Sequence, residues 1–374
     1  MDKIQKMILI GVPTSVCNLR CRYCYISQKQ ENFAETGTQA NLQYTPEQWA
    51  AALSKKRLGG ACYINICGGG ETLLTKGISK YIYALAKEGH YIEVVTNCTV
   101  TKVINDILSF EQDVLEHITF KCSFHYLQLK ERNMLDIFTN NVKNIWRHNC
   151  SANIEITPDD ELIPYIDEVK QYSLLHYGAL PHLSIARDDL NNQNYLTSLT
   201  IEEYDKIWSQ FDSSFWRFKK EIFNIYRKEY CYAGAWSLYV NMENGRTTQC
   251  YRSNYSGNIF ENIDKPIDFV AIGKCKESHC YNGHMLLTLG CIPNFTSVRY
   301  GDIRDRVRPD GTHWIQPKML AFLNSKLEET NQFSTKKRKR KDKAKCNLWL
   351  IKMFPKRALG KIKRMLKKYI VVLC

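Results

Sequence analysis

The sequence predicts an α/β fold, a partial (βα)6 barrel of the TIM type that is followed by a small cysteine-rich region and a basic tail. Short β-rich runs alternate with amphipathic, helix-like segments through the first half of the chain, and polar motifs directly follow several of these runs. Such regular alternation is typical of parallel strands joined by right-handed crossovers. In this architecture, catalytic residues lie in the loops at the carboxyl ends of the strands.

Six strand-like runs come first, and five helix-like segments separate them. The runs are "MILIGVPT", "ACYINIC", "YIEVVTN", "ITFKCSFH", "ANIEIT" and "HLSIARD". The helical segments that we expect between them are Pro46 to Leu58, Ile78 to Gly89, Val100 to Leu115, Met134 to Asn149 and Leu162 to Tyr177. Six units predict an open barrel with three quarters of the usual eight.

The pattern changes after Asp189. A polar link leads to an aromatic-rich, helix-like segment from Ile201 to Tyr230, and residues 231–295 are punctuated by Cys and Gly. A solvated charge run, "STKKRKRKDKAK", precedes a second helical segment from Pro355 to Ile370. We therefore expect three parts, at 1–190, 191–334 and 335–374.

Composition favours a folded cytoplasmic protein. The 374 residues are 44% hydrophobic, which is enough for a core, and neither a signal peptide nor a membrane-spanning run is recognisable. The cytosol keeps thiols reduced, so the 15 cysteines suit metal binding or catalysis better than disulfides.

The net charge of +14 belongs to the tail. Residues 335–374 hold 16 Lys and Arg against one acid, Asp342, so the rest of the chain is nearly neutral. A basic amphipathic helix after a polybasic run is typical of an anchor to an anionic membrane surface on the inner face of the membrane. A solvated tail and a nucleic-acid contact, the latter unlikely, remain open.

Three cysteines stand close together after the first run. Cys17, Cys21 and Cys24 have the spacing C-x3-C-x2-C, and no fourth Cys or His lies between Asn18 and Gln43. A structural zinc site requires four ligands. A [4Fe-4S] cluster that keeps one iron open fits three thiolates better, with zinc as the alternative.

At this point the sequence resembles the radical S-adenosylmethionine (SAM) superfamily, whose signature has an aromatic residue before the third cysteine, here Tyr23. The resemblance implies an enzyme of oxidoreductase type. Its open iron binds SAM, and one electron from a donor such as flavodoxin or ferredoxin cleaves SAM to a 5'-deoxyadenosyl radical that abstracts hydrogen from a substrate.

Three further motifs match the same superfamily. "CGGGET" resembles its Gly-Gly-Glu segment, so Gly68, Gly69, Gly70 and Glu71 are expected to contact SAM, with Glu71 accepting from the SAM ammonium. "TNCT" resembles a Thr-Asn-Gly-Thr segment in which Asn97 approaches the ribose, although Cys98 replaces the glycine. In "KCSFHY", Ser123 matches a residue near SAM, and His125 either contacts substrate or is structural.

Other polar residues near the expected mouth of the barrel have two interpretations each. Glu155 is a second candidate for the catalytic group, and Arg132 and Arg187 lie nearby in the predicted fold. For each of the three, the ordinary ion-pair interpretation is the favoured one.

The segment from Cys231 to Cys250 resembles the opening of the accessory domains called SPASM and twitch, which hold auxiliary [4Fe-4S] clusters. Gly245 would form the turn of a hairpin between these cysteines. By the resemblance, Cys275 and Cys280 complete one cluster, with Cys291 as a possible substitute. A structural zinc on the same thiolates is the alternative.

The substrate is the least defined part of the sequence-based prediction. No cobalamin-binding segment is recognisable, and a first strand near Met7 leaves no room for a peptide-leader-binding domain before it. These features favour oxidation or epimerisation of a sugar, a nucleotide or a lipid-linked glycan precursor. The alternatives are a peptide or protein maturase of the sulfatase-activating kind and a non-catalytic metal-binding scaffold.

Overall fold

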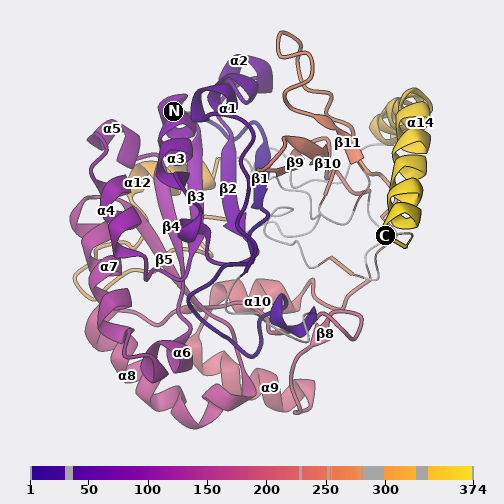
Figure 1. Cartoon of the computed structure of the whole chain (residues 1–374). Helices are drawn as coiled ribbons and strands as arrows, with labels where there is room; N and C mark the ends of the chain where they lie inside the picture. Colours follow the sequence, from indigo (N-terminus) through magenta and orange to yellow (C-terminus); the bar gives the residue numbers. More distant parts are fainter. Residues whose placement is uncertain are drawn as a thin grey trace.

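The computed structural model describes residues 2–29, 37–226, 230–250, 253, 255–275, 277, 279–280, 299–325 and 336–372. Cys291 lies outside these residues. The described strands form a nine-stranded sheet with the order β11-β10-β9-β1-β2-β3-β4-β5-β6, and a two-stranded ribbon pairs β7 with β8 (Figure 1).

Neighbouring strands from β1 to β6 are parallel and follow chain order, which confirms the predicted α/β fold with a barrel-like parallel sheet. Most residues of β1 to β5 are buried because both faces of a parallel sheet are covered. The strand bounds are Met7–Val12 (β1), Tyr63–Gly68 (β2), Tyr91–Thr96 (β3), Ile118–Ser123 (β4), Ser151–Ile156 (β5), His182–Leu183 (β6), Arg187–Asp188 (β7), Asn194–Tyr195 (β8), Ser237–Asn241 (β9), Arg246–Thr248 (β10) and Tyr255–Asn258 (β11).

Helices cover the outer face of this sheet, as Figure 1 shows for α3, α4 and α7. The α-helices are Pro46–Ala52 (α1), Lys55–Leu58 (α2), Ile78–Lys87 (α3), Thr101–Leu108 (α4), Gln112–Leu115 (α5), Tyr126–Glu131 (α6), Leu135–Arg147 (α7), Ile166–Tyr177 (α8), Ile201–Trp208 (α9), Ser214–Lys220 (α10), Pro317–Leu323 (α12) and Lys336–Val372 (α14). Short 3-10 helices lie at Ser27–Lys29, Thr72–Leu74, Asp160–Tyr165 and Ser209–Phe211.

Three predicted helices are interrupted in the structure. Pro46 to Leu58 divides into α1 and α2, and Val100 to Leu115 divides into α4 and α5. The expected helix from Ile201 onwards breaks after α9, where Asp212 adopts a left-handed conformation (φ 45°) and Ser213 caps α10 by accepting from Trp216 N–H. Side-chain oxygens that cap a new helix compete with continuation of the old one.

The second half of the chain is continuous with the barrel. β9 pairs in parallel with β1, so strands from beyond residue 190 extend the same sheet. At the amino ends of the parallel strands, Tyr300 and Phe322 pack against Met7, Tyr63 and Tyr91, which are the first residues of β1, β2 and β3. Residues 299–323 therefore close the base of the barrel.

The tail forms one long helix and not a charge run followed by a helix. α14 begins at Lys336 and includes Pro355, which cannot donate a backbone hydrogen bond. Its residues Trp349 and Met353 pack against Val270, which lies in the segment after β11, and Figure 1 shows the helix in yellow near the C-terminus. None of the helices in the described part of the chain is long and apolar enough to cross a membrane.

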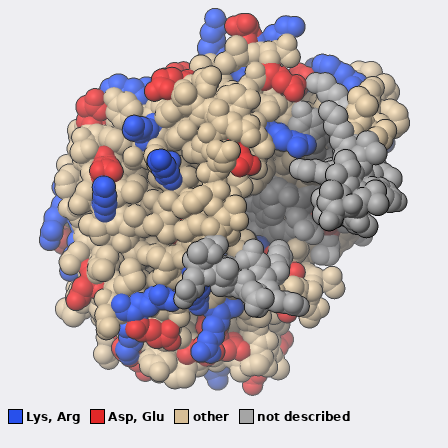
Figure 2. Space-filling model, in the orientation of Figure 1, with Lys and Arg blue, Asp and Glu red and all other residues tan. Residues whose placement is uncertain are grey.

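Figure 2, in the orientation of Figure 1, shows acidic and basic side chains interspersed over the surface of the barrel. This mixture agrees with the nearly neutral charge of the chain outside the tail.

Candidate active site

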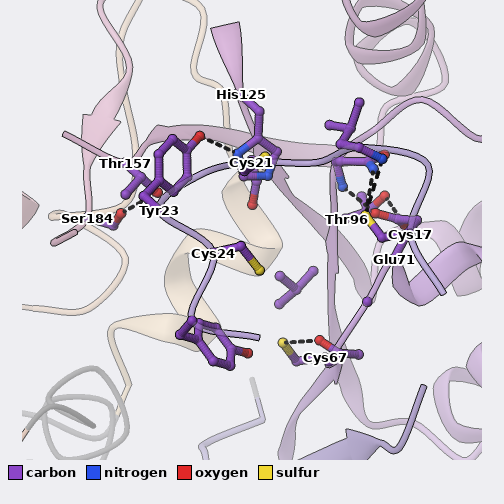
Figure 3. A pocket seen from close by; sticks show the side chains of 18 of the residues that line it. Cys17, Cys21, Tyr23, Cys24, Cys67, Glu71, Thr96, His125, Thr157 and Ser184 are labelled. Carbon is purple, nitrogen blue, oxygen red and sulfur yellow. Dashed lines mark hydrogen bonds between the residues drawn. The ribbon is translucent and has the colours of Figure 1, made fainter. Parts of the chain in front are cut away.

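A cavity of about 310 Å³ lies at the carboxyl ends of the barrel strands. Loops after β1, β2 and β3 line it together with the ends of β4 and β5 and the segment after β6. Its volume is at the lower end of the range of small-molecule sites, roughly 300–1,000 Å³. The three clustered cysteines, the glycine motif and the predicted polar residues meet here (Figure 3); the lining residues include Cys17, Cys21, Cys24, Gly68, Gly69, Gly70, Glu71, Asn97, Ser123, His125 and Glu155.

The three cysteines project from the loop that follows β1. Cys24 N–H donates to the Cys21 carbonyl (3.1 Å), and Leu19 N–H donates to Cys17 Sγ (3.5 Å). Burial, and then the neighbouring Cys24 and Cys17 thiols, raise the pKa of Cys21 to about 12, and burial also raises the pKa of Cys17. Burial disfavours the ionised form of these thiols, so nearby positive charge is needed to stabilise it. The irons of a bound cluster would supply that charge.

The donor set fits an iron-sulfur cluster. Thiolates are the usual ligands of such clusters, and the three sulfurs surround one cavity. Over the described residues, no three His, Cys, Asp or Glu side chains converge on a point that could hold a single metal ion. Cys17, Cys21 and Cys24 would hold such a cluster at the wall of the cavity that they line.

The glycine motif packs against the cysteine loop. Gly70 N–H donates to the Thr14 carbonyl (2.7 Å) and Glu71 N–H to the Val16 carbonyl (2.8 Å). A Cβ at Gly70 would lie 2.1 Å from the Val16 oxygen, closer than any side chain tolerates. The glycine is required because the two loops touch, and this contact positions Cys17, which follows Val16.

Glu71 is buried and accepts three hydrogen bonds. Its Oε1 accepts from Leu73 N–H (2.9 Å) and Thr96 Oγ1 (2.6 Å), and its Oε2 accepts from Asn97 N–H (2.7 Å). Burial raises the pKa of the carboxyl, and the three donors oppose that rise. Because a carboxylate offers about four acceptor positions, Glu71 retains capacity for one ligand donor while it ties β3 to the glycine loop.

Asn97 stands beside the cysteines. Its Nδ2 donates to Asn18 Oδ1 (2.8 Å) and lies 4.0 Å from Cys17 Sγ. Cys98, which replaces the glycine of the resembled motif, adopts φ 57°, in the left-handed region that glycine favours. The backbone of this turn therefore takes the glycine-like conformation in spite of the substitution.

His125 contacts the cysteine loop through Tyr23. The Tyr23 hydroxyl and His125 Nδ1 are 2.7 Å apart, and both side chains line the cavity (Figure 3). Burial lowers the pKa of His125 to about 4, so the imidazole is neutral at physiological pH. A neutral ring that accepts from Tyr23 at Nδ1 carries a proton on Nε2.

Glu155 belongs to a buried charge network. Its Oε2 lies 2.8 Å from Lys121 Nζ, and its Oε1 contacts the Arg304 guanidinium. Arg304 also contacts Glu93 Oε1 (3.2 Å). Two cations hold the carboxylate of Glu155, which suits positioning and charge balance better than free proton transfer.

Several residues at the site were not predicted. Arg304 is separated from Glu155 by about two fifths of the chain, and no motif surrounds it. Cys67 lines the cavity from the end of β2, and the sequence signal was its place directly before the glycine motif. Arg187 lines the cavity as expected, whereas Arg132 is exposed at the end of α6 and is not among the lining residues.

The second group of cysteines is also brought together. Gly245 adopts φ 68° at the turn between β9 and β10, and Cys231 exchanges backbone hydrogen bonds with Gly273, two residues before Cys275. Burial raises the pKa of Cys231 above its usual range, and the Cys280, Cys275 and Cys250 thiols raise it further. Four partly buried cysteines in one neighbourhood are a donor set that suits a second cluster.

One part of the chain matches a known protein family. Residues 12–118 match the family model of the radical SAM superfamily. No curated protein matches the chain.

Solved structures give weaker likenesses. SuiB of Streptococcus suis bound to S-adenosylmethionine has a TM-score of 0.49 at 14% identity, over 69% of this chain and 64% of SuiB. The protein anSMEcpe with bound AdoMet has a TM-score of 0.46 at 14% identity, over 68% of this chain and 78% of that one. BtrN in complex with AdoMet and 2-DOIA has a TM-score of 0.35 at 16% identity, over 71% and 82%.

Proposed function

The chain carries a radical SAM domain in residues 12–118, and on that premise we propose that it is a radical SAM enzyme. Cys17, Cys21 and Cys24 would hold a [4Fe-4S] cluster in the 310 Å³ cavity. When bound, this cluster supplies the electron that cleaves SAM to the 5'-deoxyadenosyl radical, which abstracts hydrogen from the substrate. The observation that carries the proposal is the meeting of all three cysteines with the glycine motif in one cavity.

The chain's own residues bind and orient the reactants. Glu71 has acceptor capacity left for the SAM ammonium, and Asn97 and Ser123 present polar groups to the same cavity. The neutral His125 and the Tyr23 hydroxyl hold the cysteine loop on the side of β4. Burial of the site excludes water, which protects a reactive radical from unwanted hydrogen sources.

The proposed substrate is a small molecule such as a sugar, a nucleotide or a lipid-linked glycan precursor, which would be oxidised or epimerised. Cys231, Cys250, Cys275 and Cys280 would hold an auxiliary cluster that exchanges an electron with the substrate radical, and flavodoxin or ferredoxin would reduce the first cluster. SuiB has been solved with its precursor peptide and BtrN with 2-DOIA. These structures therefore favour neither a peptide nor a small-molecule substrate. A peptide maturase is the second candidate.

Anaerobic reconstitution followed by a SAM cleavage assay tests the proposal. We expect 5'-deoxyadenosine from the native chain and none from the triple variant Cys17→Ala, Cys21→Ala, Cys24→Ala. About eight irons per chain are expected for two four-iron clusters, and about four for the triple variant. Equal deoxyadenosine from both proteins would rule out this function.

We also propose that α14 attaches the protein to an anionic membrane surface. Leu348, Ile351 and Leu359 are 68%, 72% and 60% exposed and recur at helical spacing on the side opposite Trp349 and Met353, which are buried. Exposed lysines and arginines, including Arg340 and Lys341, accompany them. An apolar stripe with basic neighbours is typical of a helix that lies in a membrane interface.

Vesicle flotation tests this attachment. The native protein should float with vesicles that contain phosphatidylserine and remain unbound with phosphatidylcholine alone. The variant Leu348→Glu with Ile351→Glu should lose most of this flotation, whereas Glu202→Gln, an exposed change on α9, should retain it. Undiminished flotation of the glutamate variant, or binding to duplex DNA in place of vesicles, would contradict the membrane attachment.

A further inference from the structure

The tail helix α14 packs on the short segment around Val270, which follows β11. Trp349 and Met353 of the helix are buried against the Val270 side chain. Lys345 Nζ, from the same helix, donates to the Phe269 carbonyl (3.2 Å). α14 therefore contacts this segment through apolar and polar side chains together.

Asp342 gives α14 a second attachment, next to Cys231. Its Oδ2 accepts from the Tyr232 hydroxyl (3.1 Å), and the Tyr232 ring stacks on Trp236 with the ring centres 4.3 Å apart. Asp342 is the one acid among the 16 Lys and Arg of residues 335–374. The single carboxylate of the basic tail thus holds the residue that directly follows a cysteine.

Hydrogen bonds connect the Val270 segment to the second group of cysteines. The Val270 carbonyl accepts from Gln249 Nε2 (2.7 Å), and Gln249 directly precedes Cys250. Cys231 and Gly273 exchange two backbone hydrogen bonds (2.8 and 3.0 Å). Val270 therefore contacts α14 through its side chain and the neighbourhood of Cys250 through its carbonyl.

The segments that carry Cys231 and Cys275 are closely packed on each other. A Cβ at Gly234 would lie 2.3 Å from the carbonyl oxygen of Val270, so the two backbones nearly touch there. Closely packed segments transmit a displacement from one to the other. A displacement of Val270 would therefore reach both cysteines.

The exposed residues of α14 point away from this contact. Leu348, Ile351 and Leu359, the stripe assigned above to a membrane surface, lie on the side of the helix opposite Trp349. A helix with two such faces can use both at once. Surface attachment of α14 is therefore compatible with its contact to Val270.

We propose that the buried face of α14 holds the second group of cysteines in the geometry that a cluster needs. This inference rests on the proposed auxiliary cluster and assigns the tail a role in its assembly. Asp342 and Trp349 are positioning residues, because they act through Tyr232 and Val270 and provide no ligand. The tail lies outside the family match at residues 12–118, so no property of the matched domain includes this role.

Hydrogen exchange of the reconstituted full chain, followed by mass spectrometry, tests this role. Trp349→Ala should speed exchange in the peptides that contain the Cys231 and Gly273 amides by about ten-fold or more, because loss of a large buried side chain loosens the segment. Trp349→Phe, which keeps an apolar ring, should exchange nearly as slowly as the native chain. Phe354→Ala is the matched control, since Phe354 is 71% exposed on the same helix, and it should exchange like the native chain.

Iron analysis and electron paramagnetic resonance measure the consequence for the cluster. Trp349→Ala combined with Asp342→Ala should fall from about eight irons per chain to about four and should lose the signal of the second cluster alone. Deoxyadenosine formation should persist in this double variant, because Cys17, Cys21 and Cys24 belong to the loop after β1. A merely structural role of α14 would instead weaken both clusters together.

Three results would overturn this role of α14. They are native exchange in Trp349→Ala, about eight irons in the double variant, and loss of both cluster signals in the double variant. A native chain with about four irons would contradict the proposed auxiliary cluster, and the exchange comparison would still decide whether α14 holds these cysteines. Absence of deoxyadenosine from the native chain would contradict the radical SAM function, so each failure gives a different result.

Discussion

Arg304 connects the base of the barrel to the active-site cavity. Its side chain is 1% exposed and contacts Glu93 of β3 and Glu155 of β5, and Glu155 in turn pairs with Lys121 in the cavity wall. Buried charges are costly to leave unpaired, so each member of this network depends on the others. The network fixes the position of Lys121, which lies where the substrate is expected.

Replacement of Arg304 should therefore destabilise the whole protein. We expect Arg304→Met to lower the free energy of unfolding by about 3–5 kcal/mol, because Glu93 and part of the charge of Glu155 remain buried without their partner. Urea denaturation followed by circular dichroism measures this loss. Arg299→Met, which breaks a half-exposed pair with Asp302, is the control and should cost no more than about 1 kcal/mol. Equal effects of the two substitutions would contradict the network.

At the scale of elements, the loops after β1 and β2 act as one unit. Backbone hydrogen bonds join residues 14–16 to residues 70–71. Gly70 allows this contact because any side chain would overlap the Val16 carbonyl. The conformation of the cysteine loop thus depends on the glycine motif directly, before any ligand binds.

Gly70→Ala should displace the cysteine loop. We expect reconstituted Gly70→Ala to retain less iron than the native chain and to lose most deoxyadenosine formation, because Cys17 follows the displaced residue Val16. Iron analysis and the cleavage assay measure both effects. Gly257→Ala is the matched control, since its new Cβ meets no atom closer than 3.5 Å. Native iron content in Gly70→Ala would show that the loops adjust independently.

Elements with local signals were predictable from the sequence, and elements held by distant contacts were not. The strand runs and the motifs that end them have local apolar and glycine patterns, so β1 to β5 and the cavity position of Cys17, Glu71 and Asn97 followed from the sequence. The partner of His125, the role of Arg304 and the packing of α14 on Val270 depend on tertiary contacts between residues far apart in the chain. Local sequence patterns do not predict such tertiary contacts.

At the scale of the whole molecule, buried neutral histidines make stability depend on pH. Burial lowers the pKa of His90 to about 4 and that of His182 to about 3. His90 accepts from Cys62 N–H at Nδ1 (3.0 Å) and donates to the Leu53 carbonyl from Nε2 (2.6 Å), so a second proton would face a donor. Both rings are neutral in the folded protein.

The unfolding free energy should fall as the pH drops below the usual histidine pKa of about 6.5. The unfolded chain then binds protons that the folded chain excludes, which favours unfolding until the pH reaches the folded pKa values. Between about pH 7 and about pH 5, we expect each histidine to account for about 2 kcal/mol. Urea denaturation at both pH values measures the change, and His90→Gln should reduce it. An unchanged pH dependence in His90→Gln would contradict the assignment.

The barrel should not fold without the residues that follow it. β9 pairs with β1 from Met7 to Gly11, and Tyr300 and Phe322 cover the base of the sheet. A chain that ends at residue 190 would expose the edge of β1, an apolar base and the carboxylates that Arg304 pairs.

We therefore expect residues 1–190 to aggregate and residues 1–325 to remain soluble, since the apolar cluster that α14 forms with the rest of the described chain is small and centred on Val270. Size-exclusion chromatography and urea denaturation of both fragments test this expectation. A monomeric, cooperatively unfolding fragment 1–190 would mean that the barrel is an independent domain. Aggregation of that fragment alone would mean that the barrel and the residues from 191 to 325 fold as one body, joined by the pairing of β9 with β1 and by the packing of Tyr300 and Phe322 on the base of the sheet.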